Sequence, residues 1–467
     1  MCGMCGDPVH PIDYRYGTDE MKSIWSERSK ILRMVDVEVA LLKALAKRGY
    51  LSEEEVKKAE EVAKNVTPER VKEIEAEIRH DVMALVKALS EQVEKVSREA
   101  ARWIHFGATS NDIIDTATAT QLRDSVAIIE RKLVELAKIL VDKAEKYRKT
   151  VCLGRTHGQA ALPTTYGFRF ALWAAEIARH IERLEELKPR LLVGQLSGAV
   201  GTQAAFGDDG VEIEKDVMEI LGLRPAIISS QIIPRDHYCE YLSYLANVSA
   251  TLEKIATNIR ILQRAEVAEL MEGFGKKQVG SSTMPHKRNP IDCENVCGLA
   301  RVIRGFDEPQ RQSSILWEER DLTNSSAERI TLVESTVLLD HILTKMIGVM
   351  ERLEVNEENA RKNLERLGGI NLSEAVMIEL TRRGLGRQEA HELVRNAAMR
   401  CYETGKSFAE CLIEDDKISK VLSHDDVTRL LKPENYLGTV EKKIENVRSY
   451  VMGVVEKALN SLNNQKV

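Results

Sequence analysis

The stretch QLRDSVAIIERKLVELAKIL, residues 121–140, decides the fold class. Its aliphatic residues return every three or four positions, which is the spacing of one face of an α-helix. The same spacing recurs over 245–262. The two stripes consist of Leu122, Val126, Ile129, Leu133, Leu136 and Leu140, and of Leu245, Val248, Leu252, Ile255, Ile259 and Leu262. Helices with such long stripes pack lengthwise in bundles, so the sequence predicts an all-α protein with a central long-helix bundle.

We predict three helical domains around these stripes. An N-terminal helical domain spans 1–108 and ends at a glycine-containing break, the central bundle spans 109–350, and a C-terminal helical domain spans 351–467. A third long helix is expected over 164–187, ended by Pro189. Because the flanking domains are small, we expect the two stripes to lie against bundles of other subunits, in a multi-subunit helical core.

The composition excludes several classes of protein. The chain has 67 Lys and Arg residues against 73 Asp and Glu residues and no basic block, which argues against nucleic-acid binding. The longest uncharged run, 191–207, holds four glycines and two glutamines, so it is no membrane span. The N-terminus has no signal-peptide core, and we expect a cytoplasmic protein. Cys2 and Cys5 form a C-x-x-C without a second pair at zinc spacing, so no metal or cofactor is expected. The redox state of the eight cysteines stays open.

The segment EGFGKKQVGSSTMPHKRNP, residues 272–290, is the strongest sign of function. Glycines precede the hydroxyl groups of Ser281, Ser282 and Thr283, and cationic side chains follow before Asn289 and Pro290. The spacing differs from that of a phosphate-binding P-loop. Proline is favoured in the first turn of a helix, so a helix is expected to begin at Pro290. A loop that gathers hydroxyl groups and cations between helices indicates a functional site.

Four further polar segments accompany it: DYRYGTDEMKSIWSE (13–27), HFGATSNDIIDT (105–116), RTHGQAALPTTYG (155–167) and ERDLTNSSAERI (319–330). Together with GSSTMPHKRNP, they resemble the signature regions of the fumarase/aspartase superfamily, and within it most closely the adenylosuccinate lyase family. Cycloisomerase relatives carry tryptophan where this chain has His157.

The resemblance implies a β-elimination that releases fumarate. The expected substrates are adenylosuccinate, which gives AMP, and the succinyl-aminoimidazole carboxamide ribotide of purine biosynthesis (SAICAR), which gives AICAR. It also implies a homotetramer in which three subunits contribute to each active site.

The resemblance assigns catalytic roles as well. His157 is the general acid and Ser281 the general base, His80 supports the acid–base chemistry, and Glu294 orients Lys287 or His157. A serine is a weak base, and Lys287 is the cation that we expect to favour its alkoxide form. The residues alone do not decide between Ser281 and Ser282 as the base. The implied substrate-binding residues are Arg15, Tyr16, Arg79, His80, Asp81, Thr109, Ser110, Gln231, Ser282, Asn289, Arg320, Ser325 and Arg329. Among them, the implied phosphate ligands are Arg15, Tyr16, Arg320, Ser325 and Arg329.

Two points stay open in this assignment. Thr109 and Ser110 precede a long helix, where they could serve as an N-cap, and the same helix terminus could also bind a carboxylate. Some relatives carry arginine where this chain has Asn295, which leaves the composition of the phosphate site open.

Two other functions remain alternatives. The first is another fumarate-releasing lyase, such as argininosuccinate lyase, which the RYGTDEM and SSAERI segments disfavour. The second is a non-catalytic scaffold, which loss of the serine or the histidine would favour; both residues are present.

Overall fold

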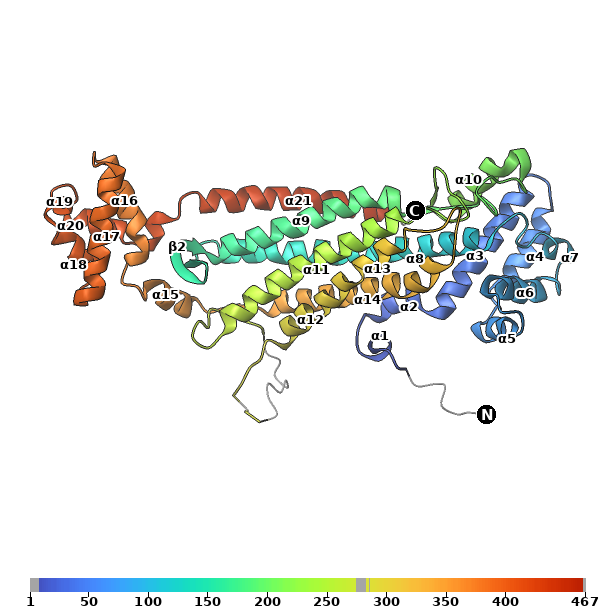
Figure 1. Cartoon of the computed structure of the whole chain (residues 1–467), viewed down its shortest axis with the longest axis horizontal. Coiled ribbons are helices and arrows are strands. Elements are labelled where there is room, and N and C mark those ends of the chain that lie inside the picture. Colours follow the sequence, from blue (N-terminus) through green and yellow to red (C-terminus); the bar gives the residue numbers. More distant parts are fainter. Residues whose placement is uncertain (1–7, 274–282, 285, 465–467) are drawn as a thin grey trace.

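The computed structural model describes residues 8–273, 283–284 and 286–464. Long helices run side by side along the middle of an elongated molecule, and a group of short helices lies at each end (Figure 1). The middle holds α8 (Ser110–Lys146), α9 (Tyr166–Leu191), α11 (Asp236–Gln263), α12 (Ile291–Gly305), α14 (Thr323–Arg352) and α21 (Val440–Asn464). The predicted all-α class and the long central helices are confirmed.

The two end groups follow the chain order. One end holds α3 (Glu27–Ala46), α4 (Glu53–Ala63), α5 (Pro68–Ile78), α6 (Asp81–Val93), α7 (Arg98–Ala101) and α10 (Gly210–Ile220). The other end holds α15 (Glu357–Glu365), α16 (Ser373–Arg382), α17 (Arg387–Thr404), α18 (Phe408–Ile413), α19 (Asp416–Ser419) and α20 (His424–Leu430). Short helices α1 (Pro11–Tyr14), α2 (Asp19–Trp25) and α13 (Asp307–Gln312) lie along the bundle.

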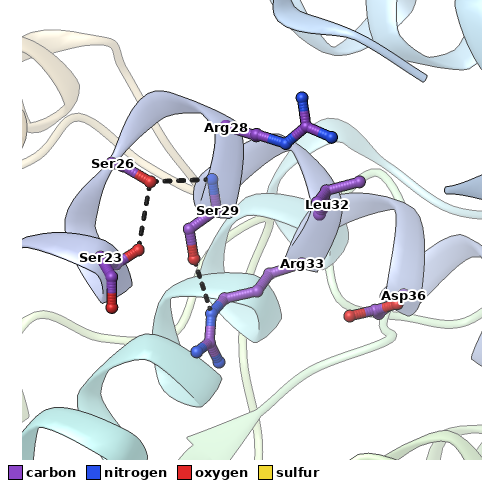
Figure 2. A pocket seen from close by; sticks show the side chains of 7 residues that line it. All are labelled: Ser23, Ser26, Arg28, Ser29, Leu32, Arg33 and Asp36. Carbon is purple, nitrogen blue, oxygen red and sulfur yellow. Dashed lines mark hydrogen bonds between the residues drawn. The ribbon is translucent and has the colours of Figure 1, made fainter. Parts of the chain in front are cut away.

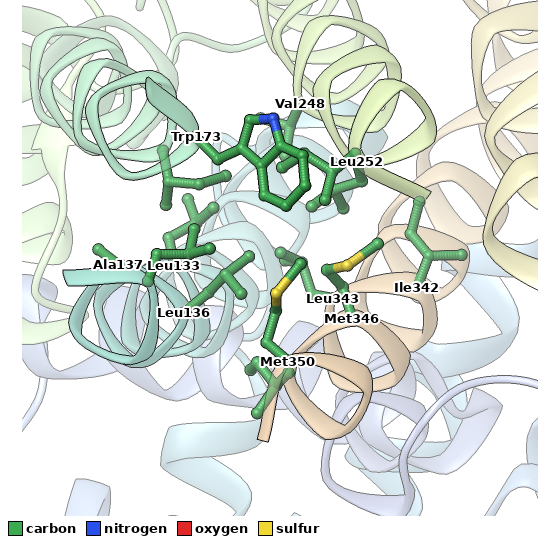
Figure 3. Close-up of a cluster of buried hydrophobic side chains, with 14 of the residues drawn as sticks. Leu133, Leu136, Ala137, Trp173, Val248, Leu252, Ile342, Leu343, Met346 and Met350 are labelled. Carbon is green, nitrogen blue, oxygen red and sulfur yellow. The ribbon is translucent and has the colours of Figure 1, made fainter. Parts of the chain in front are cut away.

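Side chains from four long helices form the centre of the bundle. Figure 3 shows Trp173 of α9 lying among leucine and methionine side chains of α8, α11 and α14. Every residue of the first stripe is at most 1% exposed, and every residue of the second is at most 6% exposed. The chain's own helices therefore cover both stripes, and the expectation that the stripes lie against other subunits is wrong.

The buried hydrophobic residues form three clusters, which bears on the domain boundaries. Helix α10 contributes Ile213 and Val217 to the cluster of α3–α6, and α21 contributes Val451 and Val455 to the central cluster. The third cluster lies within the C-terminal end group. The boundaries near 108 and 350 stay a prediction. None of the described helices is both long enough and apolar enough to cross a bilayer.

One polar segment has a secondary structure that was not predicted, and one predicted helix has a different end. The polar segment 154–167 contributes to an antiparallel hairpin of β1 (Val151–Thr156) and β2 (Gln159–Thr165). Helix α9 also continues through Pro189 to Leu191. A proline there removes a hydrogen bond only within the last turn, so the helix ends four residues later than predicted. The described residues further contain the two-residue strands β3 (Val193–Gly194), β4 (Arg224–Pro225), β5 (Leu270–Met271) and β6 (Glu354–Val355).

Candidate active site

His157 lies at the tip of the β1–β2 hairpin. Thr156 pairs with Gln159, so His157 and Gly158 form a two-residue turn, and both have positive φ, at 53° and 74°. Such a turn matches the twist of the strands, and histidine is among the residues enriched at positive φ. The His157 side chain is exposed, and in the described part of the chain no residue hydrogen-bonds to it. The hairpin therefore presents the imidazole outward from its own chain.

A buried carboxylate anchors the hairpin to the bundle. Glu269 is fully buried and accepts hydrogen bonds from Arg155 Nη2 and Tyr166 Oη, each at 2.6 Å. Asn363 Nδ2 donates a third hydrogen bond, at 2.9 Å. These bonds involve a charged group and lie in a region of low dielectric constant, where such bonds are strong. Glu269 therefore holds the base of the hairpin that carries His157.

The start of α12 positions Lys287, Asn289 and Glu294. The buried Glu272 carboxylate accepts the backbone N–H groups of Asp292 and Cys293 at 3.1 and 3.0 Å, so it satisfies two donors that this helix end leaves free. Lys287 and Glu294 are exposed. Ser281 and Ser282 lie outside the described residues.

Arg15 and Tyr16 follow α1 and lie against α14. The backbone N–H of Gly17 donates to Nδ1 of His341, and the Tyr16 ring lies 5.2 Å from the His341 ring. Nε2 of His341 is 3.1 Å from Oδ1 of Asn295 on α12. The residue that replaces an arginine of some relatives therefore lies next to the segment predicted to bind phosphate.

The Arg79–His80–Asp81 triplet connects α5 to α6. Arg79 ends α5 with a left-handed φ of 57°, and His80 is the N-cap of α6. Its Nδ1 accepts the backbone N–H of Met83 at 3.3 Å. Since a backbone N–H only donates, the proton of a neutral His80 ring is on Nε2, and this nitrogen is the one available to a substrate. His80 therefore caps a helix and can also donate a hydrogen bond.

Most of the predicted substrate-binding residues meet at this end of the molecule. Arg329 Nη2 donates to Asp81 Oδ2 at 2.8 Å. Arg320 donates to Gln231 Oε1 at 3.1 Å and to Ser325 Oγ at 3.3 Å. These bonds form two sets of residues that are far apart in the sequence. The two sets adjoin on α14 (Thr323–Arg352), where Ser325 and Arg329 lie one turn apart, and together we call them one polar group.

The start of α8 is connected to the same group. Asp112 accepts the backbone N–H of Thr109 at 2.8 Å and that of Ser197 at 2.9 Å. Gln195 Nε2 donates to Asp112 Oδ1 at 3.1 Å and to the backbone oxygen of Gln231 at 2.9 Å. Burial raises the pKa of Asp112 to about 6, which its backbone hydrogen bonds only partly offset. Sequence reasoning identified Thr109 and Ser110 but missed Asp112, although the segment NDIIDT places two acids three residues apart on an otherwise buried helix face.

A buried cluster of ion pairs lies next to this polar group. Arg235 donates to both Asp115 oxygens at 2.8 Å and to Glu328 Oε1 at 2.9 Å. These residues line a cavity of about 380 Å³ together with Ser325, Arg329 and Lys30. Burial, and to a smaller extent the Arg329 charge, lowers the pKa of Lys30. None of Asp115, Arg235, Glu328 and Lys30 was predicted, because a buried ion pair between distant segments leaves no local pattern.

A second cavity, of about 440 Å³, lies on α2 and α3 and contains none of the predicted site residues. Figure 2 shows that Ser26 Oγ accepts the backbone N–H of Ser29 and that Arg33 Nε donates to Ser29 Oγ. Arg33 also pairs with Asp124 at 2.6 Å. The three serines and Arg33 of this cavity thus take part in local hydrogen bonds and one ion pair. No group of three or more His, Cys, Asp or Glu residues in the described ranges could hold a metal ion.

Helix lengths separate the predicted residues into three groups. Thr109 and Ser110 lie at one end of α8 and the His157 hairpin follows its other end, about 55 Å away for a helix of 37 residues. On α14, Ser325 and His341 are 16 positions apart, which corresponds to about 24 Å. Figure 1 shows the hairpin and α6 at opposite ends of the bundle. One copy of the chain does not bring all predicted residues together.

Comparisons with family models and with known sequences point to the same family. A family model described as "Lyase" matches residues 13–305, and one described as "Adenylosuccinate lyase C-terminus" matches residues 369–447. An adenylosuccinate lyase of Archaeoglobus fulgidus is 70% identical over 96% of this chain and 100% of its own length. One of Methanocaldococcus jannaschii is 50% identical over 94% of this chain and 95% of its own length.

Solved structures agree in fold. A fumarate lyase from Mesorhizobium sp. BNC1 superimposes with a TM-score of 0.85 at 32% identity, covering 95% of this chain and 100% of that chain. A 3-carboxy-cis,cis-muconate lactonizing enzyme from Pseudomonas putida superimposes with a TM-score of 0.87 at 32% identity, covering 95% and 99%. The fold is therefore shared by enzymes with different reactions.

Proposed function

The chain belongs to the adenylosuccinate lyase family of the fumarase/aspartase superfamily, and on this premise we propose that it cleaves adenylosuccinate to AMP and fumarate. We propose the same elimination for SAICAR, which gives AICAR and fumarate. The enzyme is thus a carbon–nitrogen lyase of purine nucleotide biosynthesis. The sequence-based expectation of a cytoplasmic location stays a prediction.

The observation that carries this proposal is the polar group around Ser325. Arg320 donates hydrogen bonds to both Gln231 and Ser325, and Arg329 lies one helical turn after Ser325 on α14. Guanidinium groups beside a hydroxyl suit the oxygens of a nucleotide phosphate. Argininosuccinate carries no phosphate, so this group favours a nucleotide substrate over the runner-up lyase.

The proposed chemistry needs one base and one acid. Ser281 removes the proton from the carbon next to a succinyl carboxylate, the carbon–nitrogen bond breaks, and His157 protonates the departing nitrogen. Lys287, near the start of α12, is suited to stabilise the negative charge that develops on the carboxylate. Glu294 lies on the first turn of the same helix, and its proposed role is to orient Lys287 or His157. The role of Ser281 rests on family membership alone, since this residue lies outside the described part of the chain.

We further propose a homotetramer whose active sites each combine three chains. The separation of about 55 Å along α8 supports this, because His157 and the Thr109–Ser110 terminus of one chain are too far apart for one substrate. The exposed position of His157 supports it as well. The hairpin would then reach the site of a neighbouring chain.

A turnover assay with four substrates tests the proposed activity. Purified enzyme is given adenylosuccinate, SAICAR, argininosuccinate or malate, and the products are separated by chromatography. We expect AMP or AICAR together with fumarate from the first two substrates. Turnover of argininosuccinate or malate alone would identify another lyase, and inactivity on all four would favour a scaffold.

The shared site is tested with the His157→Ala and Ser281→Ala proteins, each of which we expect to be nearly inactive. After subunit exchange, random assortment leaves both groups intact in roughly a quarter of the sites. Mixed tetramers that form but stay inactive would show that both residues belong to one chain.

A further inference from the structure

Two consecutive residues of α14 hold the backbone that follows Arg15 and Tyr16. Asp340 Oδ2 accepts the backbone N–H of Thr18 at 3.1 Å and its hydroxyl at 2.7 Å. His341 Nδ1 accepts the backbone N–H of Gly17 at 3.2 Å. The proposed function uses neither Asp340 nor His341.

The ring of His341 is fixed in one tautomer by its two contacts. Nδ1 receives a backbone N–H and therefore carries no proton, so in the neutral ring Nε2 carries it and donates to Asn295 Oδ1. Burial, and next the Lys345 charge, lowers the pKa of His341. The ring is therefore neutral at pH 7 and keeps Nδ1 available as an acceptor.

Asp340 is fully buried, and its charge is balanced from a second helix. Lys132 of α8 forms an ion pair with Asp340 and also donates to Thr344 Oγ1 at 2.8 Å. A buried carboxylate that is both paired and hydrogen-bonded is a rigid anchor. The segment is thus bound to the bundle core.

The anchored segment fits closely against α14. Gly17 has a φ of +82°, and a Cβ atom there would lie 2.5 Å from Cγ1 of Val337. Only glycine allows the backbone to approach the helix this closely. The Tyr16 ring meets the His341 ring edge-on at 5.2 Å, with an interplanar angle of 61°.

This inference rests on the proposed function. We propose that His341, together with Asp340, is a positioning residue that places Arg15 and Tyr16 at the phosphate end of the substrate, with Asn295 fixing the orientation of the imidazole. A backbone that is held before the substrate arrives loses less conformational entropy on binding. The effect belongs to phosphate binding, so it acts on the nucleotide and not on the fumarate half.

Two replacements of His341 separate its two contacts. In His341→Asn, Oδ1 takes the place of Nδ1 and can still accept from Gly17, whereas the contact with Asn295 is lost. In His341→Gln, the longer amide reaches the place of Nε2, and the Gly17 N–H is left without its acceptor. An unsatisfied backbone donor costs enough to weaken binding by about tenfold or more.

We expect His341→Gln to raise both the KM for adenylosuccinate and the Kd for AMP by about tenfold, with kcat changed by less than about threefold. Inhibition by fumarate should stay at the wild-type value. His341→Asn should lie within about threefold of the wild type in all four quantities. His391→Gln, on the exposed face of α17, is the matched control and should change none of them.

Hydrogen exchange of the backbone amides provides a readout that needs no substrate. The amides of Gly17 and Thr18 should exchange faster in His341→Gln and at the wild-type rate in His341→Asn. An unchanged AMP affinity in His341→Gln would overturn the inference, and so would an equal loss of fumarate inhibition, which would indicate general damage. A wild-type protein that binds AMP but does not cleave adenylosuccinate would refute the proposed function and leave this inference standing.

Discussion

Replacing Arg235 by methionine tests the buried ion cluster beneath the candidate site. The Arg235 side chain is 2% exposed, and it neutralises Asp115, which is also 2% exposed, and Glu328, which is 10% exposed. Methionine keeps much of the length of the side chain and removes the charge. Two carboxylates in a region of low dielectric constant would then lose their common cation.

The structure limits the size of the effect. Breaking a buried ion pair from one side destabilises a protein by about 3–5 kcal/mol, because the remaining charge stays buried. A stranded carboxylate can instead take up a proton. For a group with an ordinary pKa near 3.9, this costs about 5 kcal/mol at pH 7.5 and about 2 kcal/mol at pH 5.5. Protonation of a stranded carboxylate therefore limits the loss of stability that this carboxylate causes.

The pH dependence has a definite sign. Without Arg235, the folded-state pKa of Glu328 rises further above its unfolded value, because burial then acts on a carboxylate that has lost its cation. Burial already raises the pKa of Glu328, although Arg235 and Asn324 lower it. The destabilisation through Glu328 is then complete above this raised pKa, and it decreases as the pH falls toward the unfolded value.

We therefore expect Arg235→Met to lower the free energy of unfolding by about 3–5 kcal/mol at pH 7.5 and by clearly less at pH 5.5. Denaturant titration followed by circular dichroism at both pH values measures this. The matched control is Arg190→Met, which removes an exposed pair with Glu240 and should cost at most about 1 kcal/mol. Adding Asp115→Asn to Arg235→Met should recover part of the loss. A loss below about 1 kcal/mol at pH 7.5, or one that grows toward acid pH, would refute this reasoning.

Two further predictions concern stability and the hairpin. Burial lowers the pKa of His180 to about 4, so the imidazole is harder to protonate in the folded protein than in the unfolded chain, and acidification from pH 7 to pH 5 should lower the free energy of unfolding by about 2 kcal/mol through this residue. Denaturant titration should show that the His180→Gln protein lacks this part of the loss at acid pH, and an unchanged pH dependence would contradict the prediction. Gly158 has a φ of +74°, and a Cβ atom at this position would have no atom within 4 Å. Gly158→Val should therefore strain only the backbone of the turn beside His157, and we expect kcat to fall by about tenfold or more with little change in the thermal midpoint of unfolding. Equal losses of activity and thermal stability would contradict a local effect.

The helices could be predicted because their signal is local and repeated. Leu122 to Leu140 report one helix face at six positions, and burial of that face is what stabilises the helix. The same pattern does not say which surface covers a stripe. Here the chain's own long helices do so, because three or four of them surround each stripe lengthwise.

The hairpin at 151–165 could not be predicted in the same way. It has no apolar–polar alternation, and its turn of His157 and Gly158 is not among the most frequent turn sequences. Its anchor to the bundle is Glu269, which lies more than a hundred residues further along the chain. A motif identified the histidine, but only the fold shows that a strand pair presents it.

The same limit explains which site residues were missed. Arg320, Ser325 and Arg329 belong to one recognisable segment, whereas Arg235 and Asp115 act together across 120 positions of the sequence. A sequence motif identifies residues that lie close together in the sequence, such as those proposed to contact the substrate. The charges that hold those groups in place are visible only once the chain is folded.

Helix length also limits how the proposed active site can be assembled. A straight helix of 37 residues keeps its two ends about 55 Å apart, and α8 has the Thr109–Ser110 terminus at one end and the His157 hairpin beyond the other. A substrate of nucleotide size spans only a fraction of this length. If both ends take part in catalysis, they must belong to different sites, and each site must be completed by another chain. The rigidity that makes α8 a good scaffold is therefore the reason that a single chain is not expected to be active.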